Sequence, residues 1–321
     1  MSEHTIWEAK LKPLGGLGRL EGLVNFFVEK GISPPRDFDN YRVVVMAGDN
    51  GISREGISIY SPADSVRIVQ AHLEEAAATP VFLSRIGKEE ILVDVGLFSP
   101  VDSGRVWDYR IRPGSGNFLV EPAMTREEAV QALEAGARVA ARLDGLDIVG
   151  IGEIGVGNTV AAVAALASLL DLPAGQLADR GSGVSDSVLS RRISSIEKAI
   201  ALHQPCPGDV LDAVSKVGGV TLAAMTGFII GAGEKRLPVM LDGFVASVAA
   251  LLATRLSGTC RELLVASHLS REKGHRLVLR ELGLVPLFDF DLNYGEGLGA
   301  ALGLFLCELA FVFSRRITQM F

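Results

Sequence analysis

A glycine-rich stretch between two apolar segments constrains this chain more than any other feature. Residues 150–159 read Gly-Ile-Gly-Glu-Ile-Gly-Val-Gly-Asn-Thr. The mostly apolar run 146–149 predicts a short strand before the glycines, and residues 159–170, rich in Ala, Val and Leu, predict a buried helix after them. Glycine lets backbone N–H groups approach a ligand closely, and a helix N-terminus presents unpaired donors. The pattern therefore predicts an anion site suited to phosphate; a turn without a ligand is the structural alternative.

The length and the apolar runs favour a cytoplasmic protein with an extensive buried interior that includes an oligomer interface. The chain has 321 residues, and 48% of them are hydrophobic, which is enough for a large core. The apolar run 217–233 contains five glycines and is shorter than a membrane span, and the run 298–314 is interrupted by Glu308. The segment 1–10 lacks the charged-then-apolar pattern of a signal peptide. We expect no membrane association.

Charge and metal-ligating residue types exclude two further classes of function. The net charge is −7, and the 31 Lys and Arg residues form no stripe, which argues against nucleic-acid binding. Cys206, Cys260 and Cys307 are scattered and odd in number, and the five histidines show no ligand spacing. Neither a disulfide framework nor a metal site is indicated.

Alternating strand and helix patterns predict a doubly wound α/β fold, with a mostly parallel sheet covered by helices on both faces. We expect residues 36–290 to form this large catalytic domain. The N-terminal arm, residues 1–35, and the C-terminal segment, residues 291–321, are expected to pair as a small helical domain. The predicted strands are 42–46, 91–95, 146–149, 237–241, 261–266 and 285–290, and the longer predicted helices are 20–30, 63–86, 125–143, 159–170, 244–256 and 271–283.

At least five of the predicted strands end in Gly, Asp, Asn, Ser or His. Examples are Asp49 after the first strand, Asp242 after the fourth and His268 after the fifth. In open parallel sheets, ligands bind beyond the carboxyl ends of the strands. These polar ends are therefore expected to share one cleft.

The glycine stretch also fits a dinucleotide-binding fingerprint in form, but its surroundings do not. That fingerprint needs a second strand and an acidic residue about 20 positions on. Asp171 and Asp179 are near enough in number, yet residues 172–178 make no convincing strand. An NAD-type Rossmann enzyme is thus disfavoured. A nucleotide-binding protein without transferase activity stays an alternative, although Glu153 and Glu296 both occupy glycine-flanked loops, where a carboxylate suits chemistry.

Seven blocks of the sequence, in the family's order and over nearly the whole chain, resemble the nicotinate-nucleotide:dimethylbenzimidazole phosphoribosyltransferase family. This family makes the lower-ligand nucleotide of cobalamin. The resemblance implies transfer of phosphoribose from nicotinate mononucleotide to a ring nitrogen of an aromatic base, without a cofactor. It also implies a homodimer in which each cleft is completed by its neighbour. The blocks are residues 13–20, 47–60, 152–159, 180–192, 216–219, 241–250 and 274–299.

The resemblance assigns roles to individual residues. It implies that Glu296 is the general base, whereas the structural alternative is a cap on the following helix. Glu153 would lie near the ribose, either stabilising an oxocarbenium-like centre or hydrogen-bonding the hydroxyls. Arg192 stands where the family has a Lys that holds phosphate. The phosphate loops would be formed by Gly155, Gly157 and Asn158 and by Gly181, Ser182 and Gly183.

The part of the site that would bind the base departs from the family pattern. The family's Gly-Asp-His-Gly block has Asn50 in place of His, and Val66 stands where a base-contacting Gln is usual. Tyr294 replaces an aliphatic residue, and the family's Tyr-Pro pair is interrupted here as Tyr60-Ser61-Pro62, while Ser58 is retained. The lower base is therefore 5,6-dimethylbenzimidazole, another benzimidazole, a purine or a phenol. A phenolic acceptor would raise the prospect of a heteromeric partner, as in some relatives.

Overall fold

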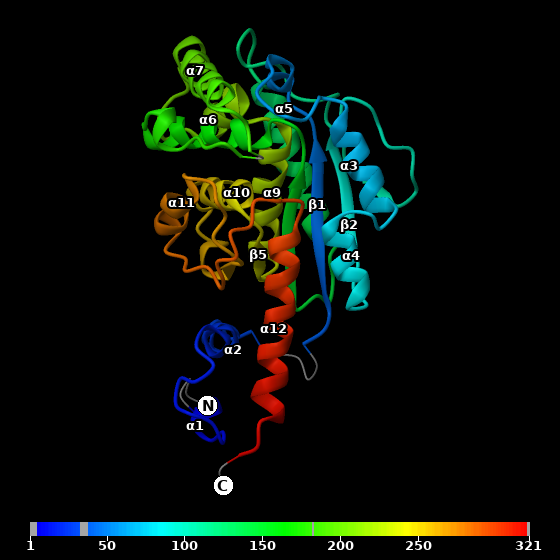
Figure 1. Ribbon diagram of the computed structural model, residues 1–321, viewed down its shortest axis with the longest axis vertical. Helices are drawn as coiled ribbons and strands as arrows, with labels where there is room; N and C mark the ends of the chain where they lie inside the picture. Colours follow the sequence, from blue (N-terminus) through cyan, green and yellow to red (C-terminus); the bar gives the residue numbers. More distant parts are fainter. Residues whose placement is uncertain (1–4, 33–37, 182, 320–321) are drawn as a thin grey trace.

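The computed structural model describes residues 5–32, 38–181 and 183–319. Within these ranges the chain forms a six-stranded sheet of order β3-β2-β1-β4-β5-β6, and every neighbouring pair of strands is parallel (Figure 1). This confirms the doubly wound α/β fold. The strands are β1 (Tyr41–Gly48), β2 (Glu90–Gly96), β3 (Val106–Asp108), β4 (Ile148–Ile154), β5 (Val239–Leu241) and β6 (Leu264–Ala266).

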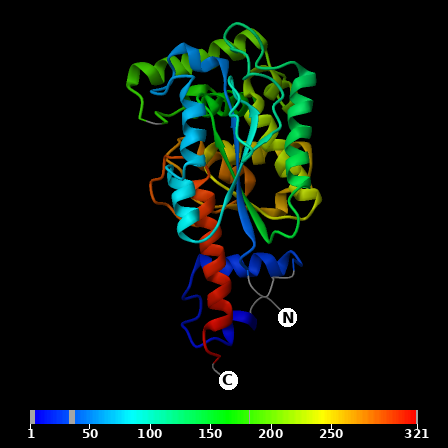
Figure 2. The same cartoon turned by 90° about the vertical axis from the view of Figure 1, so that its right-hand side faces the viewer.

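Helices cover both faces of the sheet (Figure 2). Alternate side chains of β1 enter different cores: Val44 and Met46 pack with the core that includes α5, α6, α9 and α10, while Val43 and Val45 pack with α2, α3, α4 and α12. The helices are α1 (Thr5–Glu8), α2 (Arg19–Glu29), α3 (Asp64–Leu73), α4 (Ala78–Arg85), α5 (Arg126–Ala141), α6 (Asn158–Leu170), α7 (Asp186–His203), α8 (Val210–Ala213), α9 (Val220–Glu234), α10 (Phe244–Leu256), α11 (His275–Leu282) and α12 (Leu298–Arg316).

The strand order places a crevice at the centre of the sheet. β1 pairs with β2 on one side and with β4 on the other, so the chain turns to opposite sides after β1 and after β4. Loops that diverge at such a switch point leave space for a ligand at the carboxyl ends of the strands. Ala47 pairs with Ile154, so these ends of β1 and β4 are level with one another.

The central strand is longer than predicted, because Gly150 and Gly152 belong to β4 and not to a turn. α12 packs directly against this strand. A Cβ atom on Gly150 would lie 3.0 Å from Leu304 Cδ1 and 3.1 Å from Ala300 Cβ. The first two glycines thus allow close packing of a helix on a strand, and the turn itself begins at Gly155.

The prediction of one helix over residues 63–86 is wrong, since α3 and α4 are separate helices. Glu75 has a φ angle of 54°, and the amide of Ala76 donates to the carbonyl of Ala71. This is a Schellman ending, which glycine usually forms, so no residue type marks it in the sequence. The predicted strand 285–290 is also wrong: only Phe288 forms an isolated bridge, to His268.

α12 extends beyond the sheet and meets α2, the helix of the N-terminal arm (Figure 1). Its first turns contact β4 and β5, so this helix joins the arm to the sheet. The division into domains 36–290 and 1–35 with 291–321 stays a prediction. By length and composition alone α12 is apolar enough to cross a membrane, but 44% of it is buried inside the protein, and Tyr41 donates a hydrogen bond to its Glu308.

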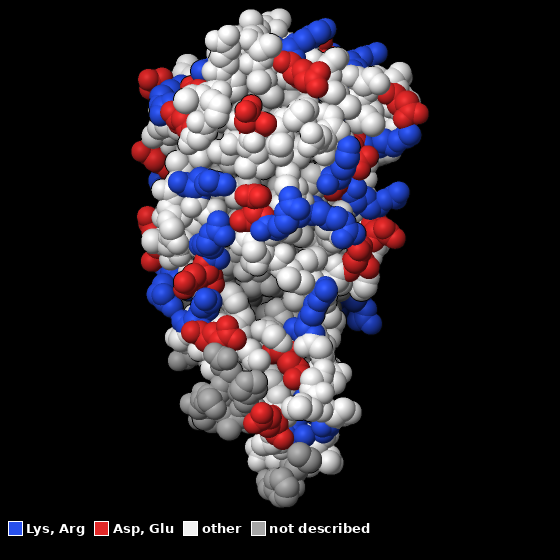
Figure 3. All heavy atoms as spheres, turned by 90° about the vertical axis from the view of Figure 1, so that its left-hand side faces the viewer, with Lys and Arg blue, Asp and Glu red and all other residues white. Residues whose placement is uncertain are grey.

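Two further apolar helices, α9 and α10, are nearly completely buried in the core. α9 packs closely on α5, and a Cβ atom on Gly136 of α5 would lie 1.8 Å from the carbonyl oxygen of Ala224. Both helices are therefore part of the interior and not an oligomer interface. On the outer face shown in Figure 3, Lys and Arg are interspersed with Asp and Glu.

Candidate active site

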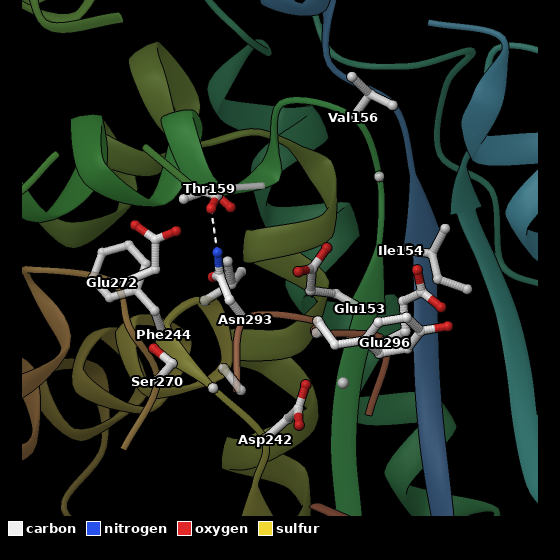
Figure 4. Close-up of a pocket in the computed structure, with 18 of the residues that line it drawn as sticks. Glu153, Ile154, Val156, Thr159, Asp242, Phe244, Ser270, Glu272, Asn293 and Glu296 are labelled. Carbon is white, nitrogen blue, oxygen red and sulfur yellow. Dashed lines mark hydrogen bonds between the residues drawn. The ribbon is translucent and has the colours of Figure 1, made fainter. Parts of the chain in front are cut away.

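The carboxyl ends of β4, β5 and β6 and the loop before α12 line one cleft (Figure 4). Glu153 is contributed by β4, Asp242 follows β5, His268 follows β6 and Glu296 precedes α12. The polar ends of these three strands therefore share one cleft, as expected from the sequence, whereas Asp49 after β1 is buried and does not line it. Two of the three central carboxylates, Glu153 and Glu296, are those that the sequence singled out.

Glu153 is held by a short chain of side-chain amides. The Asn158 amide donates a hydrogen bond to one Glu153 oxygen, and Asn50 donates to Asn158 Oδ1 over 2.7 Å. Asn50 thus fixes the orientation of the Asn158 amide. Burial raises the pKa of Glu153 to about 7; the Asn158 hydrogen bond opposes this rise, and the charges of Asp242 and Glu296 add to it.

Glu296 sits on a loop whose backbone is fixed from two sides. Its φ angle is 58°, in the left-handed region between Gly295 and Gly297, and its carbonyl oxygen accepts a 2.8 Å hydrogen bond from Thr79. Its side chain reaches back to α3, where His72 Nε2 lies 3.0 Å from Oε2. The carboxylate is therefore oriented at the mouth of the cleft.

The free backbone amides at the start of α12 donate hydrogen bonds to Asp242 and not to Glu296. Its two carboxylate oxygens each accept a 3.1 Å hydrogen bond, from the amides of Gly297 and Ala300. The N-cap residue of α12, Gly297, has no side chain with which to cap the helix itself. Burial raises the pKa of Asp242, the nearby His268 and these amides oppose the rise, and the carboxyl group ties the end of β5 to the Glu296 loop.

The second end of the cleft has the features of an anion site. Gly157 has a φ angle of 99° and begins α6, whose first turn contributes Thr159 to the lining. Gly155, Gly181 and the buried Arg192 also line the cleft. Arg192 donates to the carbonyl oxygens of Ile57 over 2.6 Å and Asp179 over 3.0 Å, and so it braces two loops.

Two other residues that were predicted to form the phosphate loops do not line the cleft. Asn158 is buried behind Glu153 and does not line the cleft, and Gly183 is also not among the lining residues. Ser182 lies outside the described residues. Asn293 crosses to this loop and donates a hydrogen bond to the carbonyl oxygen of Gly181 (Figure 4).

Three of the four predicted base-binding residues line the cleft together. Ser58, Tyr60 and Tyr294 are lining residues, and the Tyr294 hydroxyl accepts a 3.1 Å hydrogen bond from the amide of Ala78. Burial raises the pKa of Tyr294 to about 12, with the Glu296 carboxylate adding to the rise. Val66 does not line the cleft; Ile68, two residues further along α3, does.

Sequence reasoning missed Glu272. It is 8% exposed, lines the cleft, and its Oε2 has no hydrogen-bond partner among the described residues. Burial raises its pKa to about 7, helped by Asp179 and opposed by Arg192. Glu272 lies in the irregular stretch before α11, where no strand end or glycine loop marks it.

Among the described residues, no group of three or more His, Cys, Asp or Glu side chains is arranged to hold a metal ion. The cleft instead joins an aromatic end with Tyr60 and Tyr294, a pair of carboxylates, and a glycine and arginine end. An arrangement of this kind can hold an anionic substrate at one end, an aromatic ring at the other, and a proton acceptor between them.

Comparisons with known proteins agree with this arrangement. A family model described as "Phosphoribosyltransferase" matches residues 3–320. A relative from Roseiflexus sp. (strain RS-1), named nicotinate-nucleotide–dimethylbenzimidazole phosphoribosyltransferase, is 41% identical over 303 residues, which cover 93% of this chain and 86% of the relative. A relative of the same name from Geobacter metallireducens is 37% identical over 302 residues, with the same shares covered.

The fold agrees as well. The crystal structure of CobT from Thermus thermophilus is similar with a TM-score of 0.91 and 35% sequence identity, over 99% of this chain and 96% of that one. With a family match over almost its entire length and relatives at this level of identity, the chain belongs to this phosphoribosyltransferase family.

Proposed function

We propose that this chain transfers phosphoribose from nicotinate mononucleotide to a ring nitrogen of an aromatic lower-ligand base in cobamide biosynthesis. Membership of the family and the names of its relatives support the reaction. The observation that carries the proposal is the position of Glu296. Its carboxylate neighbours the Tyr294 hydroxyl, and Glu153 lies between it and Thr159 of α6 (Figure 4).

In the proposed reaction, a ring nitrogen of the base attacks the anomeric carbon of the ribose. A carbon–nitrogen bond forms to the base, the bond to the nicotinate nitrogen breaks, and nicotinate leaves. The N–H proton of the acceptor ring passes to the Glu296 carboxylate, which acts as general base. The product is the α-riboside 5′-phosphate of the base.

Glu153 is proposed to face the ribose. It lies between the base end and the phosphate end, and only its ionised form can stabilise positive charge that develops at the anomeric carbon. Since the pKa of Glu153 is about 7, the ionised fraction rises between pH 6 and pH 8. Turnover is expected to rise over the same interval.

The phosphate is proposed to lie at the N-terminus of α6 and against Gly181 and Arg192. A helix N-terminus offers free amides to an anion, and a guanidinium adds a fork of donors. Arg192 already donates to Ile57 and Asp179, so its free donors are limited, and it both contacts the ligand and holds the two loops.

For the acceptor, we propose a benzimidazole. The relatives are named for dimethylbenzimidazole, and Tyr60 and Tyr294 both line the cleft, where aromatic side chains can contact an aromatic base. The departure at Val66 no longer supports an altered base pocket, because this residue does not line the cleft. Tyr294, which also departs from the family pattern, does line the cleft. It is therefore the substitution that bears on base preference.

The direct test is incubation of the purified chain with nicotinate mononucleotide and one base at a time, with the products identified by mass. The bases are dimethylbenzimidazole, benzimidazole, adenine and a cresol. Formation of nicotinate and one riboside phosphate supports the proposal. Binding of nicotinate mononucleotide without any product would favour a nucleotide-binding protein, and product only after addition of a second subunit would indicate a heteromer.

We further propose that the chain acts as a homodimer in the cytoplasm. α12 is strongly apolar, yet Leu302, Phe305, Leu306, Leu309 and Val312 are only partly buried. A second copy would cover this face. Three free cysteines fit a reducing compartment. Sedimentation analysis of the wild-type chain and of Leu306→Glu tests the dimer, which the charged residue should dissociate.

A further inference from the structure

His72 joins three segments that are distant in the sequence. It lies in the last turn of α3, is 1% exposed, and is placed between two carboxylates. Nδ1 lies 2.8 Å from Glu90 Oε1 at the start of β2, and Nε2 lies 3.0 Å from Glu296 Oε2 before α12. The ring thus connects the start of β2 to the proposed general base.

The geometry selects the charged form of this ring. A neutral imidazole has one N–H group, so it can donate to only one of the two carboxylates, and its other nitrogen would face an acceptor. The imidazolium donates to both. Burial lowers the pKa of His72, but the hydrogen bonds and charges of Glu296 and Glu90 outweigh burial and raise it to about 9.

We propose that His72 is a positioning residue for the proton-transfer step, where its imidazolium holds one oxygen of the Glu296 carboxylate and leaves the other directed toward the base. Glu90 holds the ring from behind. This inference rests on the proposed function, in which Glu296 is the proton acceptor. Because His72 engages Oε2, Glu296 retains a second oxygen for the acceptor N–H.

The charges around Glu296 explain why a cation is needed there. Glu153 on β4 and Asp242 after β5 are negative neighbours, and the Tyr294 hydroxyl is adjacent. Carboxylates that share a site repel one another, whereas a contacting cation attracts a carboxylate and fixes its position. Loss of the imidazolium is therefore expected to leave the Glu296 side chain free to turn away from the base.

The first test observes the ring itself. Protein labelled with ¹⁵N-histidine is titrated by NMR, and His72 is assigned by the signal lost in His72→Gln. We expect both ring nitrogens to stay protonated up to about pH 8 in the wild type, and this limit to fall in Glu90→Gln and in Glu296→Gln. A neutral His72 at pH 7 in the wild type would overturn the proposal without reference to activity.

The second test compares kcat and KM of His72→Gln and His72→Phe with the wild type at pH 8, above the pKa of Glu153, with circular dichroism and thermal melts to verify folding. His203→Gln is the matched control, because His203 contacts the carbonyl oxygen of Phe118 and not the cleft. We expect kcat to fall in both His72 variants, and to fall less in His72→Gln, whose amide can still donate a hydrogen bond to Glu296. KM for nicotinate mononucleotide should be unchanged.

The outcomes separate the inference from the proposed function. A wild-type kcat in both folded His72 variants, or a fall in kcat matched by a rise in KM for nicotinate mononucleotide, would mean that His72 is merely structural and would overturn the inference. Wild-type turnover by Glu296→Gln would instead contradict the proposed function, and with it any role of His72 in proton transfer. A lower kcat with unchanged KM in the folded His72 variants, and a larger loss in Glu296→Gln, is the predicted result.

Discussion

The backbone of Gly297 lies directly against Gly152, and no side chain fits between them. A Cβ atom built on Gly152 would be 2.4 Å from both the N and the Cα atom of Gly297. Gly152 precedes Glu153, and Gly297 follows Glu296. Contact between the two glycines therefore fixes the distance between the two carboxylates, and it places the loop before α12 on the end of β4.

Gly152→Ala should consequently disturb both folding and catalysis. The added methyl group meets backbone, which has little freedom to move, so we expect the free energy of unfolding to fall by about 1–3 kcal/mol. Glu296 should be displaced and kcat reduced. Gly175→Ala is the control, since its nearest new contact would be at 3.9 Å. Denaturant titration and steady-state kinetics would contradict this expectation if the two variants behaved alike.

Arg192 is expected to contribute to nucleotide affinity. Arg192→Glu should weaken binding of nicotinate mononucleotide by about 1.5–3 kcal/mol, the scale of a charge-assisted hydrogen bond. Arg192→Lys should retain part of the affinity, because the charge stays while the planar fork is lost. The neighbouring exposed Arg191 provides the control as Arg191→Glu. Calorimetry that finds unchanged affinity in folded Arg192→Glu would remove this residue from the phosphate site.

The raised pKa of Glu153 predicts how stability depends on pH. Between the ordinary value of 4.5 and about 7, the folded protein holds a proton that the unfolded chain has released. The contribution of this group therefore becomes less favourable as pH rises through that window. Relative to the wild type, Glu153→Gln should gain about 1–3 kcal/mol between pH 4.5 and pH 8. The exposed Glu197, changed to Gln, should show no such gain in denaturant titrations.

Tyr294 is expected to influence which base is used. Tyr294→Leu removes an aromatic wall, so the KM for benzimidazoles should rise by about 2–10-fold, the scale of one aromatic contact. Tyr294→Phe keeps the ring and should remain close to the wild type. Competition among dimethylbenzimidazole, benzimidazole, adenine and a cresol measures the preference. If the product mixture were the same for all three proteins, Tyr294 would have no part in selecting the base.

Periodicity and glycine patterns were sufficient to predict most of the fold. The alternation of apolar strands and helices indicated the parallel sheet, and the predicted helix 125–143 corresponds to α5, where Thr125 and Glu128 form a capping box. The break between α3 and α4 was not predictable, because Glu75 takes a conformation that sequence patterns assign to glycine. The extent of β4 was missed for the opposite reason: Gly150 and Gly152 resemble turn residues but serve helix packing.

Part of the site could also be predicted from local sequence signals. Glu153 and Glu296 are marked by flanking glycines, and the strand-end rule pointed to Asp242 and His268. His72 and Glu272 carry no local signal, since each lies among ordinary helical or irregular residues and reaches the site only through tertiary packing. The substituted Val66 was given a role that its position in α3 does not support.

The most direct test of the proposed mechanism is single-turnover transfer by Glu296→Gln, with binding and stability measured on the same protein. Glutamine keeps the shape of the side chain but cannot accept the proton. We expect a loss of roughly 10²–10⁴-fold in turnover, the usual scale for a general base, with nicotinate mononucleotide affinity and the thermal midpoint unchanged. Turnover near that of the wild type in a less stable protein would contradict the mechanism, because Glu296 would then serve the loop and not the reaction.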